Sequence, residues 1–290
     1  MTVIPAPFSY HRPNTLAEAT ALLAQYSEEA RALAGGQSLI PMMKLRLAVP
    51  EHLVDLGGIA ELKGIQHSGN TIVIGAMTTQ HELVGSKTIA DAIPIIREAA
   101  LLVADPQVRY VGTLGGNVAN GDPGNDMPAI MMCLDTSFRL AGRDGPRTVK
   151  ARDFYQGIYA TALKPGEIVT AIEIAVPPAG HGYAYEKLKR KVGDYATAAA
   201  GVILTVHLGK IATCAITFTN LSDRPLLAKD AAAAVIGSGL EKPTLEAASK
   251  AARAIMSPAS DTRGSVEYRT SVGGVIVERA LKRAFERAKG

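Results

Sequence analysis

Residues 31–56 read RALAGGQSLIPMMKLRLAVPEHLVDL, and this stretch decides the fold of the N-terminal part of the chain. Arg31 to Ala34 are predicted to form a short buried strand that two glycines end. The apolar stretch from Pro41 to Leu47 starts with a proline, which suits the first turn of a helix, and His52 to Leu56 follow as a second strand. The sequence therefore predicts a small βαβ-like unit.

The alternation of strand and helix continues outward from this unit. On its N-terminal side, Thr15 and Glu18 have the spacing of a capping box ahead of a helical pattern. On its C-terminal side we expect a helix near Thr88 to Val103 and strands at Thr71–Ile74, Phe138–Leu140 and Ile168–Ile174. A mixed α+β architecture is implied.

The segment Pro177-Pro178-Ala179-Gly180 is the best candidate for a linker, because successive prolines continue neither a helix nor a central strand. Beyond it, three extended segments precede three helical patterns: Tyr183–Lys189, Val202–Val206 and Ile211–Thr219, then Leu226–Ile236, Thr244–Met256 and Val266–Lys289. We therefore expect a first domain at residues 1–177, with subdomains at about 1–57 and 58–177, and a C-terminal domain at 178–290.

The composition is that of a globular protein and argues against several classes of function. Of the 290 residues, 47% are hydrophobic, but the apolar runs fall short of the roughly 20 residues needed to cross a bilayer. The first residues lack the pattern of a secretory signal, so we expect a cytoplasmic protein. Cys133 and Cys214 are too few for an iron–sulfur cluster or a zinc site and are interpreted as core thiols. The net charge is only +4, and the basic residues are mostly interleaved with acidic ones, which argues against nucleic acid as a partner.

Two glycine pairs are the most informative local features. The first, Ala34-Gly35-Gly36-Gln37-Ser38, lies between a predicted strand and a predicted helix. Glycine lets the backbone approach a ligand, and free amides at such a turn can bind phosphate. A plain tight turn explains this pair equally well when it is taken alone. The second turn, Thr113-Leu114-Gly115-Gly116-Asn117, is of the same kind, so the two together could hold one diphosphate.

Neither turn has the spacing of the G-x-G-x-x-G fingerprint or of a P-loop, so nicotinamide and nucleotide triphosphate binding are not supported. A polar cluster at residues 120–126 follows the second turn. Asp122 is interpreted as part of a turn that caps a helix beginning near Met127. Asp126 could instead accept hydrogen bonds from ribose or ribityl hydroxyls. A cofactor that carries a diphosphate, bound in a geometry other than that of these two motifs, therefore remains a candidate ligand.

At these residues the chain resembles the flavoprotein (medium) subunits of the molybdenum hydroxylases, whose FAD domain carries one AGG[HQ]S turn and one T[IL]GGN turn. The resemblance covers the whole chain. Three further segments are most similar to the carbon monoxide dehydrogenase branch of this family: IGAMTT at 74–79, ADPQVRYVGTLGGNVANGDPGNDMPA at 104–129 and HGYAYEKLKRKVGDYATAAA at 181–200.

The resemblance implies a fold of the vanillyl-alcohol-oxidase (PCMH) type, with a two-part FAD-binding region and a C-terminal domain of antiparallel sheet and helices. FAD would bind between them. Asp126 would meet the sugar part of FAD, and Tyr195 would lie near the isoalloxazine. Gln37 stands where several relatives have histidine, although either side chain can donate a hydrogen bond. The residues implied around the diphosphate are Ala34, Gly35, Gly36, Gln37, Ser38, Thr113, Gly115, Gly116 and Asn117.

The run from Lys187 to Lys191 has a plain and a functional interpretation. On a strand, Lys187, Lys189 and Lys191 would share one face. Lysines on a solvated edge strand discourage further strand pairing, and this interpretation is preferred for Lys189 and Lys191. For Lys187 we hypothesise that its charge lies near the flavin and stabilises the anionic reduced form.

The sequence shows no catalytic Ser/His/Asp grouping, metal-ligand spacing or nucleophilic cysteine, and hence no site for oxidising the substrate itself. By resemblance, that chemistry belongs to a large subunit with a molybdenum-copper cofactor. A small subunit with two [2Fe-2S] clusters would deliver electrons to this chain, in a dimer of heterotrimers. A quinone is one candidate acceptor, and association with the inner face of the cytoplasmic membrane is left open.

Three other functions stay open on the sequence alone. The chain could serve a hydroxylase of an aromatic heterocycle or an aldehyde. It could be an independent flavin enzyme, which would need an acid or base poised over the flavin N5. It could also be a scaffold whose glycine turns serve only backbone geometry, and bound flavin in the purified complex would exclude that.

Overall fold

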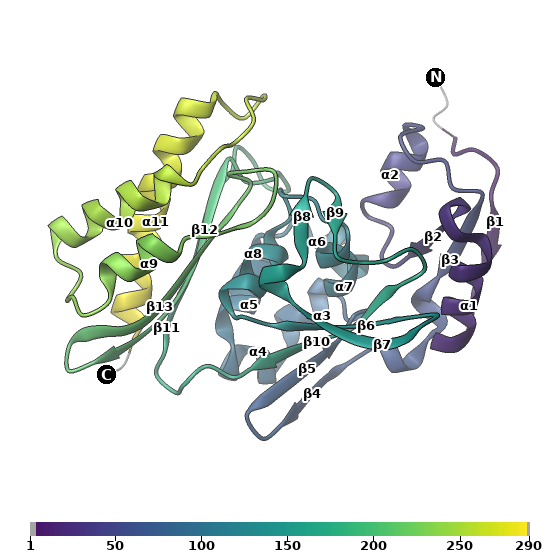
Figure 1. The fold of residues 1–290 in the computed structure, drawn as a ribbon, viewed down its shortest axis with the longest axis horizontal. Coiled ribbons are helices and arrows are strands. Elements are labelled where there is room, and N and C mark those ends of the chain that lie inside the picture. The colour runs from purple at the N-terminus through teal and green to yellow at the C-terminus, as the bar shows by residue number, and fades with distance from the viewer. Residues whose placement is uncertain (1–3, 289–290) are drawn as a thin grey trace.

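The computed structural model describes residues 4–288, so the first three residues and Lys289, the end of the last predicted helix, lie outside the described part. The elements form three modules, each built on its own sheet (Figure 1). The N-terminal module lies at one end, a five-stranded sheet with helices in the middle and a four-stranded sheet with helices at the other end. The α+β architecture is confirmed. Between residues 4 and 288, no helix combines the length and the apolar character needed to cross a membrane.

The N-terminal module contains the predicted βαβ unit. Its sheet is parallel, in the order β1-β3-β2, because α2 crosses between β2 and β3. Thr15 caps α1 as predicted, but the Glu18 carboxylate accepts from the amide of Asn14, so the capping box is only half formed. Arg31 and Ala32 are exposed, not buried, since β2 lies at a sheet edge. The elements are β1 (Ser9–His11), α1 (Leu16–Tyr26), η1 (Ser27–Glu29), β2 (Ala30–Leu33), α2 (Leu39–Lys44), β3 (His52–Asp55), η2 (Leu56–Gly58) and η3 (Ala60–Leu62).

The middle module is an antiparallel sheet, in the order β4-β5-β10-β6-β7, packed against six helices. The helix predicted from Thr88 to Val103 is broken into α4 and α5, because Pro94 starts a new helix and cannot continue an old one. The elements are β4 (Ile65–Ser68), β5 (Thr71–Gly75), α3 (Gln80–Gly85), α4 (Lys87–Ala92), α5 (Pro94–Leu102), α6 (Pro106–Val111), α7 (Leu114–Ala119), α8 (Asp126–Cys133), β6 (Ser137–Gly142), β7 (Gly145–Lys150), η4 (Ala151–Asp153), β8 (Tyr155–Gly157), β9 (Ala160–Thr161) and β10 (Ile168–Ala175).

The C-terminal module is an antiparallel sheet, in the order β11-β12-β13-β14, with three helices on one face (Figure 1). The long helix α11 lies so close to β11 that a Cβ on Gly182 would fall 2.0 Å from the carbonyl oxygen of Ala284. The pattern predicted as a helix from Leu226 starts as a short strand. The elements are β11 (Gly182–Leu188), β12 (Ala198–His207), β13 (Lys210–Thr219), β14 (Leu226–Leu227), α9 (Lys229–Val235), α10 (Lys242–Ala254) and α11 (Val266–Arg287).

Glu98, on α5, joins the middle and C-terminal modules. One carboxylate oxygen accepts from the amide of Tyr185 on β11 at 2.7 Å, and the other accepts from the guanidinium of Arg287 on α11 at 2.8 Å. These bonds hold β11 against α5. The end of β11, which carries Lys187, therefore lies beside the first residues of α8.

Candidate functional site

A cavity of about 980 Å³ is lined by residues of all three modules. The β2–α2 turn, the start of α7 and the loop after β11 each contribute residues to its lining. The structure brings all the residues predicted for the site to this one cavity: Ala34, Gly35, Gly36, Gln37, Ser38, Thr113, Gly115, Gly116, Asn117, Asp126, Lys187 and Tyr195. Residues more than 150 positions apart in the chain thus share one site.

The first glycine turn is a backbone feature that other residues would disrupt. A Cβ on Gly35 would lie 2.3 Å from the carbonyl oxygen of Val111, so only glycine fits against the end of α6. Gly36 has a φ of 71°, in the left-handed region that favours glycine. Among residues 4–288, the backbone amides of residues 35–38 have no hydrogen-bond acceptor. This turn lines the cavity and has several free N–H groups, as an anion site requires.

The second glycine turn has a different role. Thr113 caps α7, and its Oγ1 accepts from the amide of Gly116 at 3.0 Å, while the amide of Gly115 donates to the carbonyl of Ala76 at 2.8 Å. These amides are already engaged within the protein. A Cβ on Gly116 would lie 3.2 Å from the Cβ of Ala34, so the two turns touch. The first turn can therefore donate hydrogen bonds to a diphosphate. The second turn has no free amide at Gly115 or Gly116, and its glycines leave room for a diphosphate to approach.

Buried polar atoms without a protein partner indicate what kind of ligand fits the cavity. Three such atoms belong to residues that line it: Oε1 of Gln80, Oδ1 of Asn117 and Nδ2 of Asn120 have no partner among the described residues. The two oxygens need donors such as sugar hydroxyls, and the nitrogen needs an acceptor such as a phosphate or hydroxyl oxygen. A cofactor that carries both a diphosphate and sugar hydroxyls, as FAD does, matches this set.

Sequence reasoning did not identify Gln80 or Asn120 as site residues. Asn120 follows Asn117 by three positions, a helical spacing that places both on one side of α7, and this signal could have found it. Gln80 begins α3, and its Nε2 donates to the carbonyl of Thr113 at 3.4 Å. No local pattern links Gln80 to the second glycine turn, which is 33 residues further along the chain.

A buried cluster joins Asp126 and Lys187, which line the cavity, to Tyr185, which does not. Asp126 accepts from the Tyr185 hydroxyl at 2.5 Å and, through its other oxygen, from the Lys187 ammonium at 2.8 Å. The ammonium also donates to the carbonyl of Leu102 at 3.2 Å. Burial raises the pKa of Asp126, and the ion pair with Lys187 opposes that rise. Because both carboxylate oxygens are engaged, Asp126 has only spare lone pairs to offer a sugar hydroxyl.

The other two lysines of the basic run are placed differently from the prediction. Strand β11 ends at Leu188, so Lys189 and Lys191 belong to the following loop and share no strand face with Lys187. Lys191 is exposed to solvent, whereas Lys189 is half-buried, and burial lowers its pKa. The edge-strand interpretation of these two residues is therefore wrong, because the chain turns away from the sheet before it reaches them.

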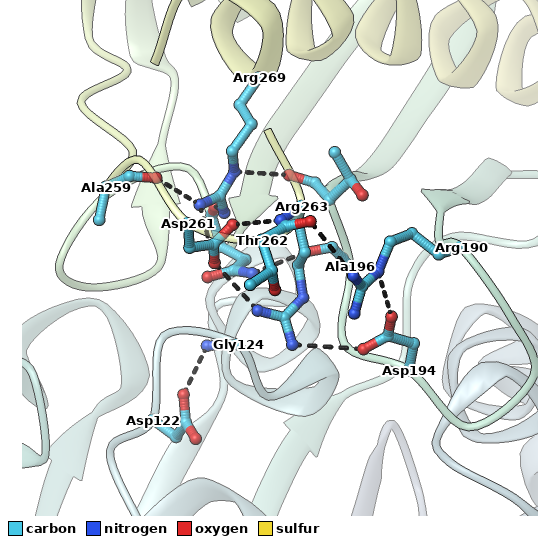
Figure 2. A network of polar contacts seen from close by, with 12 residues as sticks. Asp122, Gly124, Arg190, Asp194, Ala196, Ala259, Asp261, Thr262, Arg263 and Arg269 are labelled. Carbon is cyan, nitrogen blue, oxygen red and sulfur yellow. Dashed lines mark hydrogen bonds and ion pairs between the residues drawn. The ribbon is translucent and has the colours of Figure 1, made fainter. Parts of the chain in front are cut away.

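Asp122 and Tyr195 both lie close to Gly124, and of these two only Tyr195 lines the cavity. Asp122 accepts from the amide of Gly124 at 2.8 Å, as expected for a turn (Figure 2). It does not cap α8, since the residue at the N-cap is Asn125. The Tyr195 ring packs against Gly124, where a Cβ would lie 3.0 Å from the ring, and burial raises the pKa of its hydroxyl.

Comparisons with known proteins point the same way as the geometry. The family described as the FAD binding domain in molybdopterin dehydrogenase matches residues 6–177, and the CO dehydrogenase flavoprotein C-terminal domain matches residues 183–284. The carbon monoxide dehydrogenase medium chain of Afipia carboxidovorans is 59% identical to this chain, over 99% of this chain and 100% of its own length.

Two further comparisons extend this result. A crystal structure of the Cu,Mo-CO dehydrogenase in its cyanide-inactivated form contains a chain that superposes with a TM-score of 0.97 at 59% identity, covering 98% of this chain and 100% of that one. The glyceraldehyde dehydrogenase medium chain of Sulfolobus acidocaldarius is 35% identical, over 96% of this chain and 98% of its own length.

Proposed function

Because this chain belongs to the family of FAD-binding subunits of the molybdopterin dehydrogenases, we propose that it is the FAD-carrying electron-transfer subunit of a molybdenum-containing carbon monoxide dehydrogenase. It is an oxidoreductase subunit whose cofactor is FAD. The observation that carries the proposal is the single cavity that collects both glycine turns, the unpartnered polar atoms and the tyrosine loop.

Each wall of the cavity has a distinct part in holding FAD. The free amides of residues 35–38 would bind the diphosphate, and Gly116 would let it approach. The oxygens of Gln80 and Asn117 would accept from sugar hydroxyls. Lys187 and Tyr195 would lie toward the isoalloxazine. When bound, FAD supplies the means to accept electrons singly and to release them in pairs.

The ion pair of Asp126 and Lys187 would control the charge beside the flavin. The Lys187 ammonium is held by Asp126 and by the carbonyl of Leu102, so it cannot move away when the flavin changes charge. Asp126 offsets part of its positive charge. The pair would therefore favour the reduced flavin less strongly than an isolated lysine would, while fixing the position of the ammonium.

The chain would be organised as an FAD-binding region at residues 1–177, with subdomains at about 1–57 and 58–177, and a C-terminal domain at 178–290. Support comes from the sheets, since none of the three main sheets includes strands from both sides of residue 177. The C-terminal domain would complete the site through Lys187 and Tyr195.

Relatives named as medium chains indicate that this chain works within a complex of several subunits. The partners would be a small subunit with two [2Fe-2S] clusters, as electron donor, and a large subunit with a molybdenum-copper cofactor, where carbon monoxide is oxidised. The assembly would be a cytoplasmic dimer of heterotrimers that passes electrons to an external acceptor, with a quinone as the first candidate to assay.

Purification of the native complex tests this function. We expect one FAD for each copy of this chain, co-purifying iron–sulfur and molybdenum subunits, and oxidation of carbon monoxide. A complete complex without stoichiometric FAD would overturn the proposal. The complex is the right sample, because the resemblance suggests that the isolated chain holds FAD only after assembly.

A second candidate is the flavin subunit of a hydroxylase that acts on an aldehyde or an aromatic heterocycle. The relative named as a glyceraldehyde dehydrogenase medium chain, at 35% identity, favours it. The medium chain of carbon monoxide dehydrogenase, at 59%, is considerably more similar. Oxidation of aldehydes but not of carbon monoxide by the purified complex would select the second candidate.

A further inference from the structure

The loop that carries Tyr195, residues 189–197 between β11 and β12, is tied to a distant segment of the C-terminal module. That segment, residues 257–264, precedes α11, and Figure 2 shows it beside the loop. The side chain of Asp194, in the loop, is only 8% exposed and lies between two arginines. One carboxylate oxygen accepts from Arg190 Nε at 2.8 Å and the other from Arg263 Nη2 at 3.2 Å.

Arg263 is the residue of that segment that reaches Tyr195. Its guanidinium carbon lies 5.6 Å from the centroid of the Tyr195 ring, within the range of a cation–π contact. Asp261 holds Arg263 twice, accepting from Nη1 at 2.9 Å and from the backbone amide at 2.7 Å. The guanidinium therefore has a fixed position beside the ring.

The segment is itself anchored, so the contact is not made by a free surface arginine. Arg269 is 2% exposed, and it donates to the carbonyl of Ala259 at 2.7 Å and to that of Thr197, at the end of the loop, at 3.1 Å. Arg190 donates to the carbonyl of Thr262 at 3.1 Å. Loop and segment are thus joined at both ends and in the middle (Figure 2).

We propose that Arg263 is a positioning residue that holds the Tyr195 ring in place at the flavin end of the cavity. This rests on the proposed function, in which Tyr195 lies near the isoalloxazine. Tyr195 is 40% exposed, and the loop before it turns through Gly193, which has a φ of 85°. Without the guanidinium, the ring would keep its packing against Gly124 but lose its contact with Arg263, and the entropy cost of ordering it would oppose FAD binding.

The experiment uses the assembled complex and a double-mutant cycle of Arg263→Gln and Tyr195→Ala. The readouts are the FAD dissociation constant and the visible circular dichroism of bound flavin. Loss of a cation–π contact predicts that Arg263→Gln weakens FAD binding by about 2- to 30-fold and changes the dichroism. If Arg263 acts through Tyr195, Arg263→Gln has little further effect once Tyr195 is alanine. Arg279→Gln, an exposed position on α11, removes the same charge and should leave both readouts unchanged.

Fully additive effects of the two substitutions, or wild-type binding and dichroism in Arg263→Gln, would overturn the inference. If Arg263→Gln does not assemble, Arg263→Lys decides, because it keeps the charge but loses the planar fork that bridges Asp194 and Asp261. It is expected to show an intermediate dichroism, and a wild-type spectrum would refute the role. A wild-type complex without FAD would instead refute the proposed function, so the two failures are distinguishable.

Discussion

Replacement of Lys187 by methionine would break the buried ion pair at the cavity wall. The two side chains are 1% and 5% exposed, and their charged atoms lie 2.8 Å apart. Methionine matches the length of lysine but leaves the carboxylate of Asp126 with the Tyr185 hydroxyl as its remaining side-chain donor. Removal of one partner of a buried pair costs about 3–5 kcal/mol, so we expect the free energy of unfolding at pH 8 to fall by that amount.

The loss should depend on pH, with a predictable sign. Burial already raises the pKa of Asp126, and removal of Lys187 removes the attraction that opposes the rise. The folded pKa of Asp126 in the variant would then lie well above its unfolded value of about 3.9. The unfolded chain releases this proton more readily, so the variant loses stability as the pH rises from the unfolded pKa toward the folded one. Urea denaturation of the full chain, followed by far-ultraviolet circular dichroism at pH 5 and pH 8, measures the difference.

The double substitution Lys187→Met with Asp126→Asn is the matched control. It removes both charges, and the asparagine oxygen can still accept from Tyr185, so most of the lost stability should return and the added pH dependence should disappear. A Lys187→Met chain that unfolds at the wild-type urea concentration at both pH values would refute this reasoning. In the complex, the same variant should lower the flavin midpoint potential, and an unchanged potential would reject the role of Lys187 near the flavin.

Three other outcomes are expected. Gly35→Ala should abolish FAD retention by the complex, because its Cβ would lie 2.3 Å from a backbone oxygen. Gly85→Ala, at a position with open space around it and no left-handed φ, should retain FAD at wild-type stoichiometry. Glu98→Gln weakens the bond to Arg287 and should lower the free energy of unfolding by about 1–3 kcal/mol. Arg287→Gln, which removes the partner of the same bond, should lower it by a similar amount. Burial lowers the pKa of His181 in the folded protein, so the fold should lose stability as the pH falls from the ordinary pKa of 6.5 toward this lower folded pKa. In thermal unfolding, His181→Asn should remove this part of the pH profile, and an unchanged profile would contradict the prediction.

Local patterns in the sequence were sufficient to predict most elements of this protein. The βαβ unit, three strands of each antiparallel sheet and the C-terminal helices follow from apolar periodicity and from glycine and proline punctuation, which are properties of neighbouring residues. The remaining strands of these sheets, β4, β7 and β14, were not predicted. The two glycine turns were visible for the same reason. Errors occurred where a single residue ends an element, as at Pro94, or where the chain leaves the sheet, as at Leu188.

The tertiary structure alone decided which contacts each predicted site residue makes. Gly115 and Gly116 read alike in the sequence, yet one packs against Ala76 and the other adjoins the first turn. The partners Asp126 and Lys187 lie 61 residues apart, and Arg263 meets the tyrosine loop from the segment before the last helix. Periodicity reports which face of an element is buried, but it carries no information about which distant element covers that face. Hydrogen bonds that occupy an amide or neutralise a charge form only after those elements have packed, so the role of each residue was set by the fold.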